Sequence, residues 1–331
     1  MKMKKHLIWD EAEYNYPVLE TFRPNIMSYI HDDDDEIHPA MIIAPGGAYC
    51  YCSASEGELV AKEVFGYGYN VFVLSYTTDY LRRTPLKMQP LKDLSRAICF
   101  VRSKCDEFKI DVNQVAVMGF SAGGHLVGSI AVHFDEPALV EKGKYAGISN
   151  RPDAVILSYP VITMGEYTHE YSKVALCGVD ASEDELEYMS LEKQVKPDTP
   201  PVFIWHCETD QAVPVDNTKM FAESLKKNHV PVEMHLFDHG RHGMSTATEE
   251  WANDPLFGLY TMDQFFEALR YMHANDMELP EPINGMDIPK NADVCQIYVN
   301  TRNNLRIDEH GDPSIHLWVE MAFDWLDNIF E

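Results

Sequence analysis

Short apolar runs alternate with segments of helical periodicity along most of the chain. Six runs rich in Val, Ile and aromatic residues predict strands, at 39–45, 69–76, 114–120, 153–160, 201–206 and 232–238. Their hydrophobicity is continuous rather than alternating, which is typical of strands buried on both faces of a parallel sheet. The alternation of such strands with helices predicts an α/β sandwich of three layers around a mostly parallel central sheet.

Amphipathic segments predict the helices that cover this sheet. Apolar residues recur on one face across 90–108, and again at three- and four-residue spacing across 313–329, where Pro313 stands just inside the helix start. Ser53 and Glu56 match a capping box that would open a helix ending near residue 65. Two further helices are predicted at 122–134 and 218–228.

Two stretches interrupt the alternation. Residues 162–195 are polar and predict a cap-like excursion made of short helical pieces. Residues 251–313 form an insertion before the last helix, with one amphipathic helix at 262–272 and an isolated strand-like segment, "CQIYVN", at 295–300. We interpret residues 1–331 as a single domain that carries both additions, and we expect the insertion to serve as a lid or an oligomer contact.

Composition excludes several classes of partner. Of the 331 residues, 53 are acidic and 27 are basic, which gives a net charge of −26. Such a chain would repel phosphate backbones and anionic lipid surfaces, so we expect neither nucleic acid nor membrane as a partner. No apolar stretch reaches the 18 residues or so that a membrane-spanning helix needs.

The seven cysteines indicate a reducing environment. They form no C-x-x-C pair and are odd in number, as is common for free thiols in a cytoplasmic protein. The first residues also lack the apolar run of a secretory signal. We therefore predict a cytoplasmic location, and we predict neither a metal nor a cofactor.

The segment "VAVMGFSAGGHL" holds a candidate nucleophile. Its Gly119-Phe120-Ser121-Ala122-Gly123 stretch follows a predicted buried strand and precedes a predicted helix. A sharp turn between strand and helix requires small flanking residues, and it lifts the serine hydroxyl clear of the sheet edge. Ser121 is therefore a candidate for nucleophilic catalysis.

A serine nucleophile needs a general base and a carboxylate that orients the base, and later loops supply both. The loop after 201–206 offers three carboxylates: Glu208, Asp210 and Asp216. The loop after 232–238 offers two imidazoles: His239 and His242. We favour Asp210, which precedes the apolar turn "AVPV", and His242, whose neighbouring glycines leave its backbone free to turn. His125 and His206 are interpreted as structural.

The loop "APGGAYCYC" is a candidate oxyanion hole. Gly46 and Gly47 follow a predicted buried strand, so their backbone N–H groups can turn toward a substrate carbonyl oxygen. The N–H of Ala122, directly after the candidate nucleophile, would be the second donor.

Taken together, these motifs resemble the α/β-hydrolase fold, and within it the acetyl-esterase branch related to hormone-sensitive-lipase-type and xylan-oligosaccharide esterases. The matching pieces are "PGGAY", "EGE", "VFVLSY", "MGFSAGGHL", "RPDAVILSYPVITMGE", "SLEKQV", "TPPVFIWHCETDQAVPVDN" and "GRHGMS". The resemblance implies Ser121 as nucleophile, Asp210 as acid, His242 as base and amides near Gly47 and Ala48 in the oxyanion hole. It departs from the family in one loop: where relatives commonly have His-Gly-Gly-Gly, this chain has Pro45-Gly46-Gly47-Ala48.

The resemblance implies hydrolysis of small acyl esters, often of O-acetylated sugars, through an acyl-enzyme. The expected partner is thus a small-molecule ester, with an acetylated oligosaccharide as the leading candidate and a homo-oligomer left open. Three aromatic residues are candidates for contact with a sugar: Tyr49, Tyr51 and Tyr159.

Two alternatives remain open at this point. One is a serine peptidase of the acylaminoacyl or dipeptidyl type, which generally carries a propeller domain ahead of the hydrolase. Only about 40 residues precede the first glycine loop here, which disfavours the peptidase. The other is a hydrolase-fold binding protein without catalysis, which is disfavoured because no member of the triad is missing.

Overall fold

An eight-stranded sheet runs through the structure, a computed structural model that describes all residues except 15, 17–21, 33–34, 141, 254–257 and 305–309. The strand order is β1-β2-β4-β3-β5-β6-β7-β8, with β3 to β8 parallel and β1 and β2 antiparallel at one edge. The strands are β1 (Lys2–Leu7), β2 (Asn25–Ile30), β3 (His38–Ala44), β4 (Asn70–Ser75), β5 (Ile110–Phe120), β6 (Ala154–Ser158), β7 (Val202–Cys207) and β8 (Val232–Phe237). All six predicted strands are confirmed as β3 to β8.

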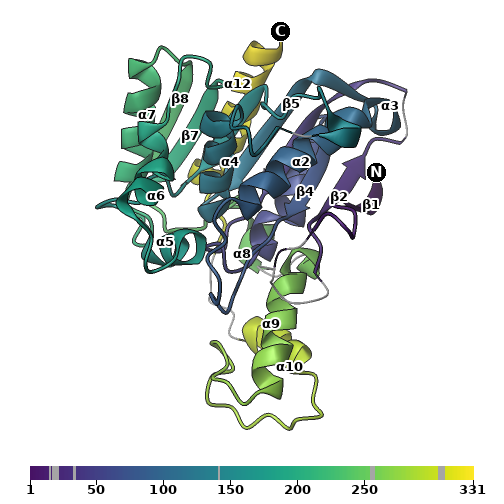
Figure 1. Cartoon of the computed structure of the whole chain (residues 1–331), viewed down its shortest axis with the longest axis vertical. Coiled ribbons are helices and arrows are strands. Elements are labelled where there is room, and N and C mark those ends of the chain that lie inside the picture. The colour runs from purple at the N-terminus through teal and green to yellow at the C-terminus, as the bar shows by residue number, and fades with distance from the viewer. Residues whose placement is uncertain (15, 17–21, 33–34, 141, 254–257, 305–309) are drawn as a thin grey trace.

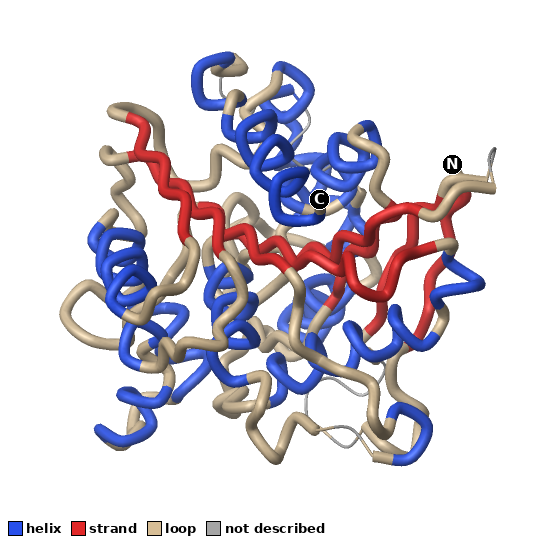
Figure 2. The backbone as a smooth tube through the Cα atoms, turned by 90° about the horizontal axis from the view of Figure 1, so that it is seen from above, coloured by secondary structure: helices blue, strands red, loops and turns tan. Residues whose placement is uncertain are grey.

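Helices cover both faces of the sheet, which gives the three layers that the sequence predicts (Figures 1 and 2). On one face pack α1 (Glu58–Gly66) and α12 (Trp318–Phe330). On the other pack α2 (Gln89–Ser103), α4 (Ala122–His133) and α7 (Asp216–Lys227). Successive strand residues alternate between these two apolar layers, so the inner strands are apolar throughout. The remaining α-helices are α3 (Cys105–Phe108), α5 (Glu170–Cys177), α6 (Glu183–Tyr188), α8 (Glu249–Asn253), α9 (Asp263–Ala274), α10 (Val294–Asn304) and α11 (Pro313–His316).

Three local predictions are wrong. The strand-like segment 295–300 lies inside helix α10, because Val294, Cys295 and Tyr298 share one helical face that packs on α9. The predicted helix 90–108 is interrupted at Lys104 and divides into α2 and α3. The capping box at Ser53 is absent, because the Glu56 side chain turns away from the helix.

The antiparallel strands β1 and β2 were not predicted. Most side chains of β1, "KMKKHL", are exposed, so this strand shows no apolar pattern of its own. It pairs with β2 through the backbone at the sheet edge, where lysines are common because they discourage pairing with another chain.

The insertion forms a small layer of its own beyond one end of the sheet. Helices α9 and α10 project away from the sheet (Figure 1), and their apolar residues form a separate cluster with Ile283. Gln264 anchors α9, because its side chain accepts a hydrogen bond from the Thr78 N–H at 2.9 Å and donates one to the Tyr76 carbonyl at 2.7 Å.

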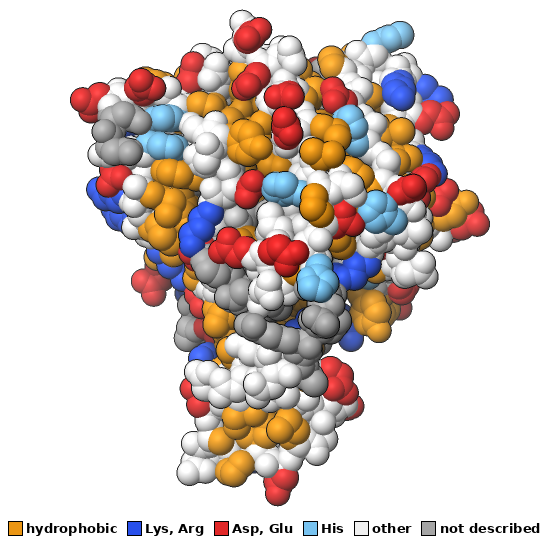
Figure 3. Space-filling view, turned by 180° about the vertical axis from the view of Figure 1, so that it is seen from behind, with side chains coloured by type: hydrophobic (Ala, Val, Ile, Leu, Met, Phe, Trp, Pro, Cys, Tyr) orange, Lys and Arg blue, Asp and Glu red, His pale blue; other side chains and the backbone are white. Residues whose placement is uncertain are grey.

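The reverse face of the molecule shows the insertion as a narrow extension of a broad body (Figure 3). Acidic side chains are spread over this face rather than gathered in one patch. Among the helices of the described residues, none has the length and apolarity that crossing a bilayer requires.

Candidate active site

Ser121 lies at the sharp turn between β5 and α4. Its backbone has φ 53° and ψ −118°, a conformation that L-residues adopt only under strain from their surroundings. A Cβ atom at Gly119 would lie 2.2 Å from the Gly123 carbonyl oxygen, and one at Gly123 would lie 2.1 Å from the Ala44 carbonyl oxygen. Only glycine fits at either position, so the two flanking glycines make the turn possible.

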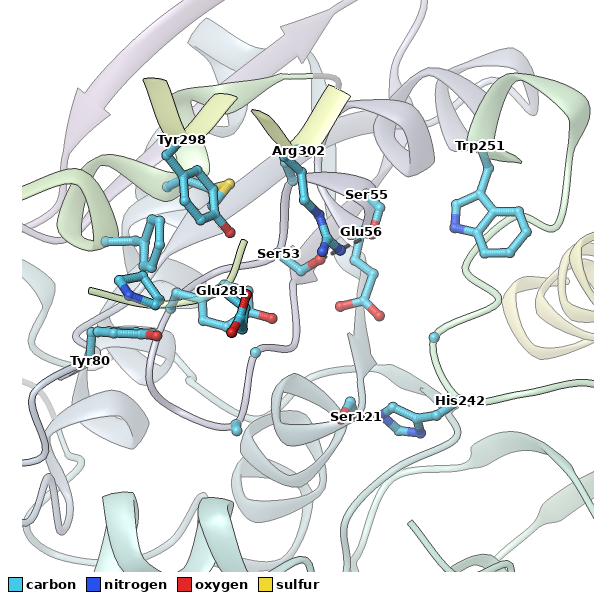
Figure 4. Close-up of a pocket in the computed structure, with 18 of the residues that line it drawn as sticks. Ser53, Ser55, Glu56, Tyr80, Ser121, His242, Trp251, Glu281, Tyr298 and Arg302 are labelled. Carbon is cyan, nitrogen blue, oxygen red and sulfur yellow. Dashed lines mark hydrogen bonds between the residues drawn. The ribbon is translucent and has the colours of Figure 1, made fainter. Parts of the chain in front are cut away.

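The structure brings Ser121, His242 and Asp210 together from three separate loops. The Ser121 hydroxyl donates to Nε2 of His242 across 2.8 Å, and Nδ1 of His242 donates to Oδ2 of Asp210 across 2.6 Å. Asp210 follows β7 and His242 follows β8, so both approach Ser121 at the carboxyl ends of neighbouring strands. Figure 4 shows His242 directed at Ser121 on the floor of a cavity. This continuous chain of hydrogen bonds can carry a proton away from the serine.

Four donors surround the Asp210 carboxylate. Oδ1 accepts from the N–H groups of Ala212 and Val213 at 2.8 and 2.9 Å, and Oδ2 accepts from His206 at 3.1 Å as well as from His242. Burial would raise the pKa of Asp210, but the hydrogen bonds from His206 and His242 outweigh it and hold the pKa well below its ordinary value. Asp210 is therefore ionised at neutral pH.

His206 was predicted to be a structural histidine, but it also contacts the candidate site through Asp210. It is fully buried at the end of β7, its Nδ1 accepts from the Thr218 hydroxyl at 2.8 Å, and its Nε2 faces Asp210. The alternatives weighed above lie elsewhere: Glu208 pairs with Lys219 on the surface, and the exposed His239 lies between Asp238 and Asp312. In the sequence, His206 looks like any core histidine. Its hydrogen bond to Asp210, at 3.1 Å, is visible only in the structure.

The loop after β3 offers backbone donors beside Ser121. Gly47 has φ 123°, and Ala48 and Tyr49 have φ 56° and 60°, so a tight turn with two left-handed residues follows Gly46. The Gly46 N–H is occupied by a hydrogen bond to the Glu56 carboxylate at 2.7 Å. In the part of the chain that the structure describes, no group accepts a hydrogen bond from the N–H of Gly47, Ala48 or Ala122. These amides can receive a developing oxyanion.

Glu56 is a site residue that the sequence analysis assigned to a helix cap instead. It is 4% exposed, and its carboxylate accepts from the Gly46 N–H and, at 2.8 Å, from the Tyr159 hydroxyl. Burial raises the pKa of the Glu56 carboxyl, while the hydrogen bonds from Tyr159 and Gly46 oppose the rise. The sequence held one indication of a role other than a helix cap: Glu56 belongs to "EGE", one of the motifs that resemble the family.

A cavity of about 460 Å³ opens above Ser121 and His242 (Figure 4). The sheet domain contributes Tyr51, Glu56 and Tyr80 to its wall, and the excursion contributes His169. Burial lowers the pKa of His169, and the nearby His242 adds to this effect, so the imidazole is neutral at pH 7. The insertion contributes seven lining residues: Trp251, Met262, Phe265, Pro280, Glu281, Tyr298 and Arg302. The opening is therefore both aromatic and charged.

Of the three tyrosines predicted to contact a ligand, only Tyr51 lines this cavity. The prediction is wrong for Tyr49 and Tyr159, which are each 1% exposed and engaged inside the protein. The Tyr49 hydroxyl bonds to Nδ1 of His125 at 2.8 Å, and the Tyr159 hydroxyl bonds to Glu56. Both residues lie beside the site, but their position in the sequence does not show whether a tyrosine ring points into the cavity or into the protein core.

His125 lies beneath the site in a packing role, as predicted. Its Nε2 donates to the Met189 carbonyl at 2.8 Å, and burial lowers its pKa to about 4, so it remains neutral. Within the described residues, no cluster of His, Cys, Asp or Glu has a geometry that could hold a metal ion.

Comparison with known proteins gives one family match. Residues 28–225 match the family described as BD-FAE. Endo-1,4-beta-xylanase B of Butyrivibrio fibrisolvens is 47% identical over 81% of this chain, and acetylxylan esterase of Xylanibacter ruminicola is 28% identical over 63% of it. The chain spans 42% of the length of each of these two relatives.

A solved structure is similar over nearly its whole length. The acetyl ester-xyloside bifunctional hydrolase of Caldicellulosiruptor lactoaceticus superposes with a TM-score of 0.68 and is 33% identical. The match covers 82% of this chain and 96% of that one.

Proposed function

Because the chain belongs to the BD-FAE family and has the α/β-hydrolase fold, we propose that it is a serine esterase that removes short acyl groups, chiefly acetyl, from carbohydrate esters. The observation that carries this proposal is the chain of hydrogen bonds from Ser121 through His242 to Asp210, at 2.8 and 2.6 Å. We assign Ser121 as nucleophile, His242 as general base and Asp210 as the carboxylate that orients the base.

Acylation begins when the Ser121 oxygen attacks the ester carbonyl and passes its proton to Nε2 of His242. Negative charge then develops on the carbonyl oxygen, and the N–H groups of Ala122, Gly47 and Ala48 stabilise it. Because these donors are held by the turn before the reaction starts, little reorganisation is needed as the charge appears. Asp210 meanwhile stabilises the imidazolium of His242.

Collapse of this intermediate breaks the ester bond, and His242 returns the proton to the departing alcohol. A water molecule then gives a proton to His242 and attacks the acyl group on Ser121. As the second intermediate collapses, His242 returns this proton to the departing Ser121 oxygen, which restores the hydroxyl and releases the free acid.

Carbohydrate as the alcohol is supported by the cavity wall and by the relatives. Aromatic rings and charged groups line the space above Ser121, and such a mixture suits the apolar faces and hydroxyls of a sugar. The names of the two curated relatives and of the solved structure refer to xylan or to a xyloside. We therefore propose an acetylated oligosaccharide, with xylan-derived material as the first choice.

We propose the role of a lid for the insertion 251–313, in preference to the role of an oligomer contact. Seven of its described residues face the cavity, among them Tyr298 and Arg302 (Figure 4). The lid would bound the part of the cavity that receives the alcohol. We also propose a reducing, cytoplasmic location, supported by seven cysteines that are all free thiols.

Turnover of graded p-nitrophenyl esters and of acetylated xylo-oligosaccharides, compared with an aminoacyl p-nitroanilide, tests the proposal. We expect acetate to be released and the anilide to remain intact. Preferential cleavage of the anilide would favour the peptidase. A fluorophosphonate should label the wild type but not the Ser121→Ala variant, and failure to label the wild type would favour a binding protein.

A further inference from the structure

Glu56 is a buried carboxylate in the cavity wall that the proposed mechanism does not use. In the described chain, neither lysine nor arginine forms an ion pair with it. Its partners are neutral donors, the Gly46 N–H at 2.7 Å and the Tyr159 hydroxyl at 2.8 Å. A buried carboxylate without a cation is costly to the fold, so the hydrogen bonds from Gly46 and Tyr159 must offset its desolvation.

On one side, Glu56 is hydrogen-bonded to the loop that carries the candidate oxyanion donors. Gly46 directly precedes Gly47 and Ala48, and its N–H is bound to Oε2 of Glu56. A Cβ atom at Gly46 would lie 2.8 Å from that oxygen and 2.9 Å from Cβ of Ser121. The Gly46 backbone is thus held tightly between the carboxylate and the nucleophile.

On the other side, Glu56 reaches the loop that carries His242. The Tyr159 hydroxyl, which donates to Glu56, accepts from the Ser245 N–H at 3.1 Å. The Tyr159 ring packs edge to face on the His242 imidazole, with the centroids 5.1 Å apart. The Ser245 hydroxyl also donates to the Ser55 carbonyl at 2.6 Å, which is a second connection between the same two segments.

We propose that Glu56 is a positioning residue, which holds the Gly46 amide and the Tyr159 hydroxyl and thereby keeps the oxyanion amides and His242 in register around Ser121. This inference rests on the proposed function of the site. The amides act on charge that exists only in the transition state, so loss of the register lowers kcat more than it raises KM. A displacement of about 1 Å at such a site costs about 10²-fold in rate.

The test compares Glu56→Ala, Glu56→Gln and Tyr159→Phe on p-nitrophenyl acetate. Glu56→Ala should lower kcat by about 10²-fold with KM changed less than threefold or so. Glutamine can accept from Gly46 through its oxygen and donate to Tyr159 through its nitrogen, so Glu56→Gln should recover about tenfold of that loss. Adding Tyr159→Phe to Glu56→Ala should lower kcat little further, because both changes break the same hydrogen bond between Tyr159 and Glu56.

The matched control is Asp93→Asn. Asp93 is also a fully buried carboxylate held by neutral donors, namely Thr77, Gln89 and Trp9, but it does not line the cavity. We expect this variant to lose stability while the folded protein keeps the wild-type kcat. Equal kcat values for wild type and folded Glu56→Ala, or parallel losses in Glu56→Ala and Asp93→Asn, would overturn the proposal.

If Glu56→Ala does not fold, Tyr159→Phe decides, because a folded variant with wild-type kcat contradicts the connection to His242. A wild type without turnover would contradict the proposed function rather than the role of Glu56. In that case the rate at which a fluorophosphonate labels Ser121 reports on the same geometry, and it should fall about 10²-fold in Glu56→Ala. An unchanged labelling rate would overturn the inference.

Discussion

His206 and His242 donate to the same oxygen of one carboxylate. Their Nε2 and Nδ1 atoms lie 3.1 and 2.6 Å from Oδ2 of Asp210, while the other oxygen is filled by two backbone N–H groups. Both oxygens of Asp210 are therefore held by hydrogen bonds, and all four donors use this carboxylate as an acceptor.

Replacement of Asp210 by asparagine should lower kcat on p-nitrophenyl acetate by about 10⁴-fold, the loss seen when a triad carboxylate becomes an amide. The amide nitrogen must face either the two histidines or the two backbone N–H groups, so one pair of donors loses its acceptor. Steady-state kinetics with circular dichroism as a check on folding measures the effect. Glu208→Gln, on the surface of the same loop, is the control. An equal loss of kcat in that variant would show that the acid role is wrongly assigned to Asp210.

Acidification should destabilise the wild type more steeply than Asp210→Asn. The pKa of Asp210 is lower in the folded than in the unfolded chain, so the unfolded chain binds more protons and stability rises with pH. The contribution is complete above the ordinary carboxyl pKa of about 4 and is lost as pH falls below it. Urea unfolding between about pH 2.5 and 6 measures the two slopes. Parallel slopes below about pH 4 would contradict the hydrogen-bonded carboxylate.

Gly123→Ala should lower the free energy of unfolding by about 3 kcal/mol or more, because the new methyl group would meet the Ala44 backbone at 2.1 Å. Gly66→Ala is the control, since a methyl group at Gly66 meets nothing within 4 Å. That variant should be neutral or more stable by up to about 1 kcal/mol. Thermal unfolding compares the two, and a well-folded Gly123→Ala with wild-type stability would disprove the tight turn.

Tyr298→Ala should raise KM for an acetylated xylo-oligosaccharide by about three- to tenfold, corresponding to about 1 kcal/mol of ring contact. It should change turnover of p-nitrophenyl acetate little, because that small ester does not need the insertion wall. Tyr271→Ala is a suitable control, since this exposed ring lies on α9 outside the cavity and packs with Arg83. If Tyr298→Ala leaves both KM values unchanged, the lid does not receive the alcohol.

Local patterns predicted the parts of this molecule whose burial determines their sequence. The inner strands are apolar because both of their faces are covered, and the glycines around Ser121 are required by backbone contacts only 2.1 and 2.2 Å from a methyl group. Both features leave a pattern in a short stretch of sequence, although the contact of Gly123 is with Ala44 on a strand distant in the sequence. The candidate loops for Asp210 and His242 followed from strand order, and the structure joins them to Ser121.

Long-range contacts account for what the sequence left unpredicted. Glu56 fits a helix cap by spacing, yet its partners Gly46 and Tyr159 lie 10 and 103 positions away. The β-branched and aromatic residues of 295–300 predict a strand. The segment is a helix instead, because its apolar face is buried against α9. Tyr49 is adjacent to the oxyanion loop in sequence, and only the His125 contact shows that it points inward.

The proposed catalytic groups come from strand ends, whereas one continuous stretch, 251–313, supplies much of the wall above them. If the proposed function holds, bond cleavage and the choice of alcohol depend on separate parts of the sequence. Under the proposed function, changes within 251–313 should alter which alcohol is accepted and leave Ser121, His242 and Asp210 in place.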